Sequence, residues 1–403
     1  MLAGRAELRI FIALLDGVGM GELPDAGHYD DEGSHTLGNL ARAVGGLRCP
    51  TLERLGLGLI EPIAGIAALP RAEGGYGKMA EQSPGKDTTA GHWEMMGVII
   101  DRPFPVYPQG FPDRLIKKIE SVTGCHFLGN KPASGTAIIE EFGVEHIDTG
   151  FPIIYTSADS VLQIAAHEDV ISPDELYRLC RLVRAVMVGA DAVARVIARP
   201  FIGQPNFYRR TPRRKDFSLP PPYPTVLDVL VEQGKRVAGV GKIGDIFTGR
   251  GISENFKSVS NHDTFRIFSE LLADDRFDLV WANFNDFDSS YGHRNDVQGF
   301  QSALEAWDVQ LSNFLPHLRC DDVLIITSDH GCDPTTSSTD HSREYALLLV
   351  ASPSFLSGFS LGIRDTFADV GATISECLEV DWKGPGTSFS AAWQLVKGEM
   401  GGE

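Results

Sequence analysis

The stretch Val323-Leu324-Ile325-Ile326-Thr327-Ser328-Asp329-His330-Gly331 joins a continuous apolar run to a polar loop. A short apolar run of this kind is typical of a strand that is buried on both faces of a sheet. Asp329 and His330 follow at the point where the strand gives way to the loop, so both side chains can turn toward one ion. His341 offers another imidazole after a short loop.

Two earlier stretches have the same character. Asp288 and His293 lie five positions apart within residues 285–293, and the apolar run Ile10–Leu15 ends in Asp16. Carboxylate and imidazole ligands from separate strand ends are what a pair of divalent metals needs. Each residue alone is compatible with an ordinary surface or core position, but together they predict a two-metal phosphoryl-transfer enzyme.

Composition narrows the class of protein. The 403 residues are too many for one core and predict two domains, and 43% hydrophobic with 22% charged residues indicates a globular chain. The net charge of −18 argues against a nucleic-acid or anionic-membrane partner. No apolar run approaches the length of a membrane span, and the N-terminus lacks the apolar segment of a signal peptide. The expected location is therefore cytoplasmic.

The cysteines are scattered and form no CxxC pair, so we interpret all six as reduced thiols. Cys332 is close to Asp329 and His330 and is a possible metal ligand. The commoner role of a single cysteine, a small packed residue, is favoured here.

Strand and helix patterns alternate along the chain, which predicts a doubly wound α/β sheet with its site at the carboxyl ends of the strands. Helical spacing of apolar residues covers His262–Leu272 and Val297–Leu318, and Asp365 is expected to cap a further helix. The expected strands are Arg9–Leu15, Arg236–Val240, Asp278–Phe284, Asp322–Thr327 and Tyr345–Val350.

Two proline-rich segments, Pro103–Pro108 and Pro220–Pro224, interrupt this alternation and indicate linkers. The metal-ligand candidates lie outside them on both sides. We therefore expect a metal-binding core formed by residues 1–100 and 216–403, with an inserted α/β cap domain at 101–215. Two ordinary long loops are the alternative.

The stretch Gly85–Glu94 contains Thr88, which has two compatible interpretations. Threonine is a common helix cap. Its hydroxyl can also be a nucleophile if a bound divalent ion lowers its pKa, and a helix start favours a phosphate on that oxygen.

With these motifs the chain resembles the phosphopentomutase family, within the alkaline phosphatase superfamily, over nearly its whole length. Asp-His-Gly is shared across that superfamily, whereas Ser157-Ala158-Asp159-Ser160 and Arg195–Phe201 are much more specific. The other matching stretches include Leu15–Glu22, Gly85–Thr88, Gly91–Glu94, Ile164–Glu168, Gly241–Ile243, Asp286–Asp288, Tyr291–Arg294, and Asp340-His341 with Arg343–Tyr345. The resemblance implies an alkaline phosphatase-like doubly wound core sheet with an inserted α/β cap domain.

The resemblance also implies two divalent ions, expected to be Mn²⁺, and a sugar bisphosphate as activator. One ion is assigned to Asp288, His293 and His341, and the other to Asp16, Asp329 and His330 with Thr88. Thr88 is expected to carry a phosphoryl group and to donate it to a pentose phosphate. The implied reaction interconverts ribose 1-phosphate and ribose 5-phosphate, and the 2-deoxy sugars, through a bisphosphate.

The implied substrate-binding residues are Ser157, Asp159, Arg195, Arg210 and Lys242, because arginine and lysine bind phosphate and a carboxylate can accept from sugar hydroxyls. The chain departs from the family pattern at Gly17, His35, Asn39, Asn295 and Cys332. None of these departures removes an expected ligand. They leave open a diverged mutase or phosphatase acting on another phosphorylated sugar.

Two further alternatives remain. Phosphoglycerate mutases share the expected core but use serine as the nucleophile and carry a different cap, so Thr88 and Arg195–Phe201 argue against that class. A metal-stabilised binding protein without catalysis is the alternative outside enzymes. No candidate ligand is missing, which disfavours it.

Overall fold

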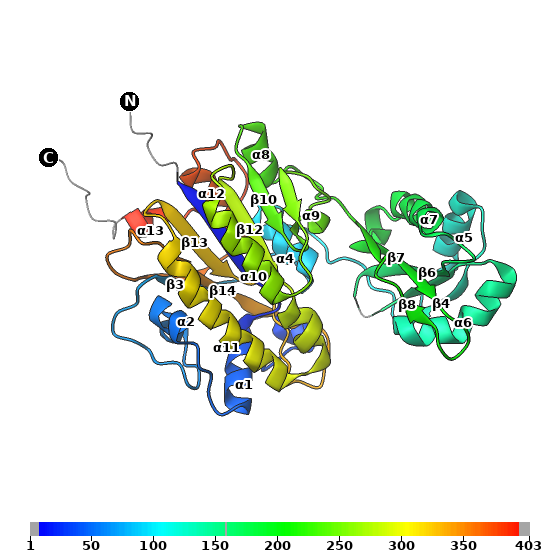
Figure 1. Ribbon diagram of the computed structural model, residues 1–403, viewed down its shortest axis with the longest axis horizontal. Coiled ribbons are helices and arrows are strands. Elements are labelled where there is room, and N and C mark those ends of the chain that lie inside the picture. Colours follow the sequence, from blue (N-terminus) through cyan, green and yellow to red (C-terminus); the bar gives the residue numbers. More distant parts are fainter. Residues whose placement is uncertain (1–7, 158, 395–403) are drawn as a thin grey trace. The chain divides into compact units, whose positions relative to one another are not determined.

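The computed structural model describes residues 8–157 and 159–394 and divides the chain into two compact units (Figure 1). The core unit comprises Met1–Arg102 and Pro221–Glu403, and the inserted unit comprises Pro103–Pro220. Both boundaries fall within or beside proline-rich sequence, where a regular strand or helix cannot continue.

In the part of the chain that the structure describes, the core unit is built on a nine-stranded mixed sheet. The strand order is β11-β10-β12-β1-β13-β14-β3-β15, with β2 paired to β14. The strands are β1 (Arg9–Leu15), β2 (Gly19–Glu22), β3 (Gly75–Met79), β10 (Val237–Val240), β11 (Glu254–Phe256), β12 (Leu279–Phe284), β13 (Asp322–Thr327), β14 (Glu344–Ala351) and β15 (Phe359–Arg364).

The central strands β10, β12, β1 and β13 are parallel and entirely buried, as their continuous apolar sequences predicted. The strand expected at Tyr345–Val350 is present as β14, but it runs antiparallel to both β13 and β3. The reason is its connection: residues 328–343 form a loop with no crossover helix, so the chain returns in the opposite direction.

Helices cover both faces of the core sheet (Figure 1). On one face the aromatic rings of Phe268, Phe284, Trp307 and Phe314 pack together with Phe11 of β1. The helices of this face are α1 (Thr36–Ala43), α2 (Pro50–Leu55), α10 (Asn261–Glu270) and α11 (Val297–Phe314).

The opposite face carries Trp281 of β12, whose ring contacts His92 and Phe247. The helices that pack there or beside one another are α4 (Thr88–Met95), α8 (Val226–Glu232), α9 (Ile243–Ile246) and α12 (Ala368–Cys377). Two short helices complete the unit, α3 (Leu57–Ile60) and α13 (Ser390–Gln394).

The described residues of the inserted unit form a six-stranded mixed sheet of order β4-β5-β6-β7-β8, with β9 paired to β7. Its strands are β4 (Leu128–Pro132), β5 (Ile153–Thr156), β6 (Val161–His167), β7 (Arg195–Ile202), β8 (Arg209–Arg210) and β9 (Lys215–Ser218). Helices α5 (Asp113–Thr123) and α7 (Pro173–Val186) pack on one hydrophobic cluster, and α6 (Gly135–Thr149) packs on another. The unit thus has its own core.

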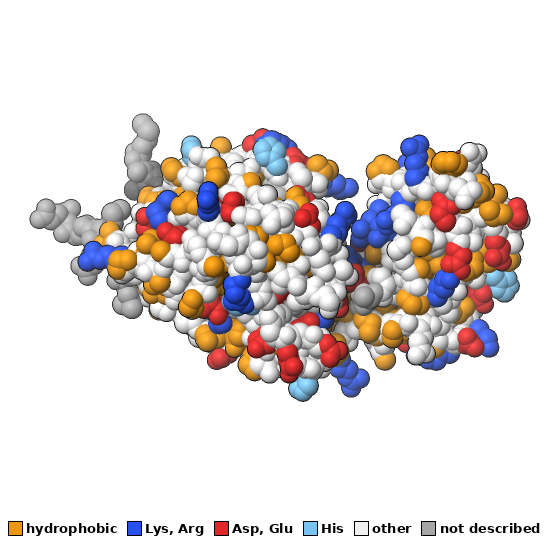
Figure 2. Space-filling model, turned by 90° about the horizontal axis from the view of Figure 1, so that it is seen from below, with side chains coloured by type: hydrophobic (Ala, Val, Ile, Leu, Met, Phe, Trp, Pro, Cys, Tyr) orange, Lys and Arg blue, Asp and Glu red, His pale blue; other side chains and the backbone are white. Residues whose placement is uncertain are grey.

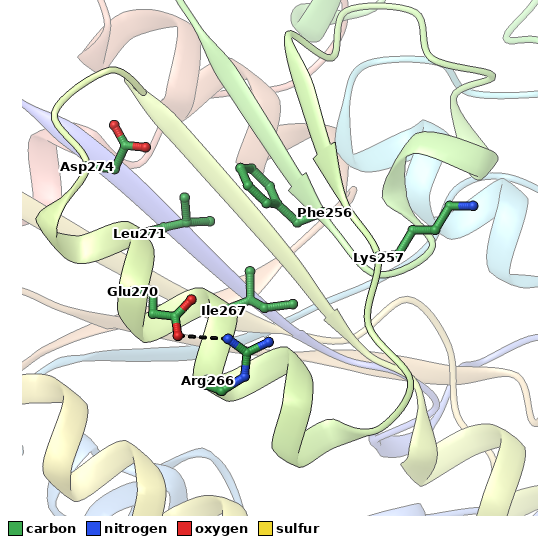
Figure 3. Close-up of a pocket in the computed structure, with 7 residues that line it drawn as sticks. All are labelled: Phe256, Lys257, Arg266, Ile267, Glu270, Leu271 and Asp274. Atoms are coloured by element: carbon green, nitrogen blue, oxygen red, sulfur yellow. Dashed lines mark hydrogen bonds and ion pairs between the residues drawn. The ribbon is translucent and has the colours of Figure 1, made fainter.

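Acidic and basic side chains are both scattered over the visible face of the molecule (Figure 2). Within residues 8–157 and 159–394, every helix is too short or too polar to span a bilayer. A surface pocket of about 380 Å³ lies beside α10 and β11, with the Arg266–Glu270 ion pair on its wall (Figure 3). It is lined by none of the candidate site residues.

Candidate active site and metal centre

Three buried aspartates lie at the carboxyl ends of three neighbouring strands. Asp16 follows β1 directly, Asp329 follows β13 after one residue, and Asp288 lies in a π-helical turn, Phe287–Tyr291, after β12. Because β12, β1 and β13 are adjacent and parallel, their carboxyl ends meet at one edge of the sheet. The three side chains are 0–6% exposed, so a substantial negative charge is held away from solvent.

The first cluster contains Asp16, Asp329 and His330, whose potential ligand atoms all lie within 4.8 Å of one another. Nε2 of His330 lies 3.5 Å from Oδ1 of Asp16 and 3.3 Å from Oδ2 of Asp329. Carboxylate and imidazole groups that converge in this way can share one divalent cation.

The second cluster contains Asp288, His293 and His341. The Nε2 atoms of His293 and His341 lie 3.4 Å and 3.3 Å from the two oxygens of Asp288, and 3.2 Å from each other. Cys332 also has its sulfur within 4.8 Å of ligand atoms of Asp288 and His293. The rings of His341 and His330 stack with centroids 3.8 Å apart, so the two clusters are neighbours.

The three histidines share one orientation. In each ring Nδ1 donates to a backbone carbonyl: His293 to Thr339 at 2.7 Å, His330 to Gly331 at 3.0 Å and His341 to Lys86 at 2.8 Å. Nε2 is therefore the nitrogen that faces the carboxylates in all three cases. A hydrogen bond from one ring nitrogen to a carbonyl fixes the tautomer and the direction of the other nitrogen, as in metal-binding histidines.

The charges at this edge of the sheet are strongly coupled. Burial, together with the nearby carboxylate of Asp329, raises the pKa of Asp16. Burial alone would lower the pKa of His330, but Asp329 and the other aspartates outweigh it and raise the pKa to about 10. Burial opposes ionisation of Asp288, yet His341 and His293 hold its pKa below the usual value. The site therefore favours added positive charge.

The donor set fits a pair of divalent cations. Oδ1 of Asp16, Oδ1 of Asp288 and Oδ2 of Asp329 are buried and complete no hydrogen bond with the described residues, although imidazole nitrogens lie 3.3–3.5 Å from them. An unsatisfied buried carboxylate oxygen is costly unless a cation or donor compensates it. Aspartate oxygens and imidazole nitrogens suit Mn²⁺, Zn²⁺, Fe²⁺ or Co²⁺.

Thr88 lies beside the first cluster as the first residue of α4. Its Oγ1 is 2.9 Å from Nε2 of His330 and 3.2 Å from Nζ of Lys242, which also pairs with Asp16. The helix cap is Asp87, whose side chain accepts from the amides of Thr89 and Ala90. The capping interpretation of Thr88 is therefore wrong, and its hydroxyl points toward the metal-ligand candidates.

The other candidate substrate-binding residues lie in the inserted unit. Arg195, at the start of β7, is 3.8 Å from Asp159 and 3.7 Å from Asp216. Ser157 follows β5, and Arg210 lies on β8 beside Gly135, where a side chain would come within 3.0 Å of the guanidinium. Lys242 belongs to the core unit and lies beside Thr88.

Polar groups that the sequence analysis did not single out surround both sets. In the inserted unit the positive charges of Arg199 and Arg214, beside that of the expected Arg210, act on Tyr155, whose pKa burial raises. In the core, His92 and Asn283 are fully buried and contact the first cluster. In the sequence, Asn283 stands out only because it is a polar side chain within the apolar run that forms β12.

Three of the departures from the family pattern have local structural causes. Gly17 has φ +73°, and a side chain there would meet Cβ of Cys332 at 2.9 Å. His35 is the N-cap of α1, since its Nδ1 accepts from the amide of Gly38 at 3.0 Å. Asn295 has φ +51°, a left-handed conformation that asparagine tolerates.

Comparisons with known proteins identify the family of the chain. Residues 229–382 match the Metalloenzyme superfamily. The chain is 56% identical over 381 residues to the phosphopentomutase of Carboxydothermus hydrogenoformans, covering 94% of this chain and 98% of the relative. It is 53% identical over 381 residues to that of Caldanaerobacter subterraneus subsp. tengcongensis, covering 94% and 97%.

Among solved structures, the chain is similar to a Leishmania mexicana phosphoglycerate mutase with a TM-score of 0.49, 13% identity and coverage of 96% and 98%. The family assignment rests on the sequence relatives, which are matched over almost their entire length. The chain therefore belongs to the phosphopentomutase family and is an isomerase of the intramolecular phosphotransferase type.

Proposed function

We propose that the chain interconverts ribose 1-phosphate and ribose 5-phosphate, and the corresponding 2-deoxy sugars, through a phosphothreonine at Thr88. The observation that carries this proposal is the position of Thr88 Oγ1, 2.9 Å from Nε2 of His330 and 3.2 Å from Nζ of Lys242. Phosphopentomutase is the name of relatives more than 50% identical to this chain.

In the proposed cycle, phosphorylated Thr88 donates to the C1 hydroxyl of ribose 5-phosphate. The bond from phosphorus to Oγ1 breaks, the bond from phosphorus to the sugar oxygen forms, and the hydroxyl proton leaves as the threonine oxygen regains one. The product is ribose 1,5-bisphosphate. The sugar then reorients, and its 5-phosphoryl group returns to Thr88, which leaves ribose 1-phosphate.

Lys242 stabilises the negative charge that develops on Oγ1 when its bond to phosphorus breaks. Its Nζ is within hydrogen-bond distance of that oxygen and pairs with Asp16. The first helix amides contribute less, because Asp87 already occupies the N–H groups of Thr89 and Ala90. A preorganised cation of this kind acts most strongly in a site with little water.

Asp16, Asp329 and His330 would hold one divalent cation, and Asp288, His293 and His341 would hold the other. When bound, the cations would neutralise charge on the transferring phosphoryl group and orient the attacking and leaving oxygens. We assign Mn²⁺ to both positions. A sugar bisphosphate would load Thr88 at the start of catalysis.

Ser157, Asp159, Arg195 and Arg210 would bind the pentose phosphate from the inserted unit. Arg195 and Arg210 carry the positive charge that a phosphate dianion requires, and arginine can bind it through two parallel hydrogen bonds. Asp159 would accept from the sugar hydroxyls.

The test is a coupled assay that measures ribose 5-phosphate formed from ribose 1-phosphate, with and without Mn²⁺, alongside the release of inorganic phosphate. The proposal predicts Mn²⁺-dependent isomerisation with little phosphate release. Intact-mass measurement after incubation with ribose 1,5-bisphosphate should show one added phosphoryl group, mapped to Thr88. Stoichiometric phosphate release would indicate a phosphatase instead, and no covalent phosphate would reject Thr88 as the nucleophile.

A further inference from the structure

We propose that His92 and Asn283 are a pair of positioning residues that holds Asp16 and Asp329 in the orientation needed to bind a divalent cation. The inference rests on the proposed function, because it concerns the cation assigned to Asp16, Asp329 and His330. It adds two residues that do not themselves contribute a metal ligand.

Asn283 fixes Asp16 from the end of β12. Its Nδ2 donates to Oδ2 of Asp16 at 2.7 Å. Because an ionised carboxylate can only accept, the amide must present its nitrogen to Asp16 and its oxygen to the other side. That oxygen lies 3.0 Å from Nε2 of His92. The bond leaves Oδ1 of Asp16, the oxygen without a donor, directed toward the cluster.

The opposite edge of the His92 ring faces Asp329 and the helix that carries Thr88. Nδ1 of His92 lies 2.8 Å from the carbonyl oxygen of Thr88 and 3.3 Å from Oδ2 of Asp329. One ring therefore connects both aspartates of the first cluster to the first turn of α4.

The ring has little freedom to move. It stacks on Trp281 with centroids 5.4 Å apart and an interplanar angle of 17°. Trp281 and Asn283 are two positions apart on β12, so both side chains lie on the same face of the sheet. His92, Asn283 and Trp281 are each 0% exposed. Buried polar groups of this kind are expensive unless they are hydrogen-bonded, and here the bonds end on the metal-ligand candidates.

The second cluster is oriented by different groups. His293 and His341 donate to the carbonyls of Thr339 and Lys86, and both rings face Asp288. Loss of the His92–Asn283 pair should therefore affect the two cation sites unequally. A role in general core packing would affect both sites alike.

The test is titration of the chelator-treated full-length protein with Mn²⁺ by isothermal titration calorimetry. The variants are Asn283→Leu, which keeps the volume but removes both hydrogen bonds, His92→Gln, and the double variant. Each single change should weaken one of the two Mn²⁺ sites about 10–100-fold, the usual effect of removing a group that orients a ligand. The other site should change by less than about threefold, and the double variant should be little worse than the weaker single one, because the two residues act as one unit.

His146→Gln is the matched control, since His146 is a buried histidine with two hydrogen bonds in the inserted unit. It should leave both Mn²⁺ affinities unchanged. Circular dichroism in chelator checks that each variant is folded. If Asn283→Leu does not fold, His92→Gln decides in the same titration.

Unchanged Mn²⁺ affinities in the folded variants, or equal weakening of both sites, would overturn the inference. If the unsubstituted protein binds no Mn²⁺, the proposed metal chemistry fails and the inference fails with it. If that protein binds two ions and the variants bind them as well, only the inference fails.

Discussion

The hydroxyl oxygen of Thr88 lies 2.9 Å from Nε2 of His330, although 242 positions separate the two residues. His330 follows β13, and Thr88 begins α4, where the carboxylate of Asp87 already caps the helix. The threonine hydroxyl is thus not needed for the helix and is directed at the edge of the sheet where the buried aspartates meet. A hydroxyl oxygen beside such a cluster is the arrangement expected of a metal-activated nucleophile.

Thr88→Ala should abolish mutase turnover, with a loss of at least about 10³-fold, because no other side chain replaces a covalent nucleophile. Thr88→Ser keeps a hydroxyl at the same position and should still take up covalent phosphate. The coupled assay measures turnover, and intact mass after incubation with ribose 1,5-bisphosphate measures phosphorylation. Full activity in Thr88→Ala would remove the nucleophile assignment.

Asp329→Ala should remove most of the stabilisation that Mn²⁺ gives to the protein. Binding to the folded state at a metal concentration one hundred times the dissociation constant adds about 2.7 kcal/mol per site to the free energy of unfolding. Thermal unfolding followed with and without Mn²⁺ measures this difference. Asp169→Ala, at an aspartate whose side chain is 90% exposed, is the control and should respond to Mn²⁺ like the unsubstituted protein. An equal response from Asp329→Ala would exclude Asp329 as a ligand.

The sequence predicted the central strands well because their apolar runs are continuous. The bounds of β1 and β13 are those expected, and β10 and β12 begin one residue later than expected. Such runs are buried on both faces, so local sequence and tertiary structure agree. The glycine-rich β3 gave no comparable signal.

The sequence could not reveal features that depend on distant contacts. The antiparallel direction of β14 follows from a loop without a helix, and Asn283 meets His92 across 191 positions. The cap expected at Asp365 was wrong: α12 begins at Ala368, and the side chain of Thr366 accepts from that amide. Candidate ligands were visible as residues after strands, whereas the groups that orient them are visible only in the folded chain.

Asp322→Ala should lower the free energy of unfolding by about 3–5 kcal/mol, because it removes the buried carboxylate partner of the Arg9 guanidinium and leaves only the carbonyl of Leu272 and the exposed Asp275. The pair is bidentate, at 2.9 and 2.8 Å, and the two side chains are 6% and 1% exposed. Urea unfolding in chelator measures the change without a contribution from metal. Glu73→Ala, which breaks the exposed Arg54–Glu73 pair, should cost less than about 1 kcal/mol. Similar decreases in the free energy of unfolding of the two variants would mean that the Arg9–Asp322 pair stabilises the protein no more than an exposed ion pair does.

The stability of the inserted unit should decrease in mildly acidic solution because of His146. This buried side chain donates from Nδ1 to the carbonyl of Phe151 at 2.8 Å and accepts at Nε2 from the amide of His167 at 2.8 Å. Protonation would replace that acceptor by a donor facing another donor. Burial also disfavours the charged ring and lowers the pKa of His146 from 6.5. The unfolded chain takes up the proton first. The contribution of neutral His146 to the free energy of unfolding is therefore complete above about pH 6.5 and is lost as the pH falls below it.

His146→Gln isolates the effect, since glutamine can accept from the same amide but does not titrate. Its free energy of unfolding should be lower than that of the unsubstituted protein at about pH 7.5, and the difference should shrink toward about pH 5.5 as the histidine loses its advantage. Urea unfolding at both pH values, in chelator to keep the cation sites out of the comparison, gives the two differences. A difference that stays constant with pH would show that His146 keeps the same proton affinity in the folded and unfolded chain.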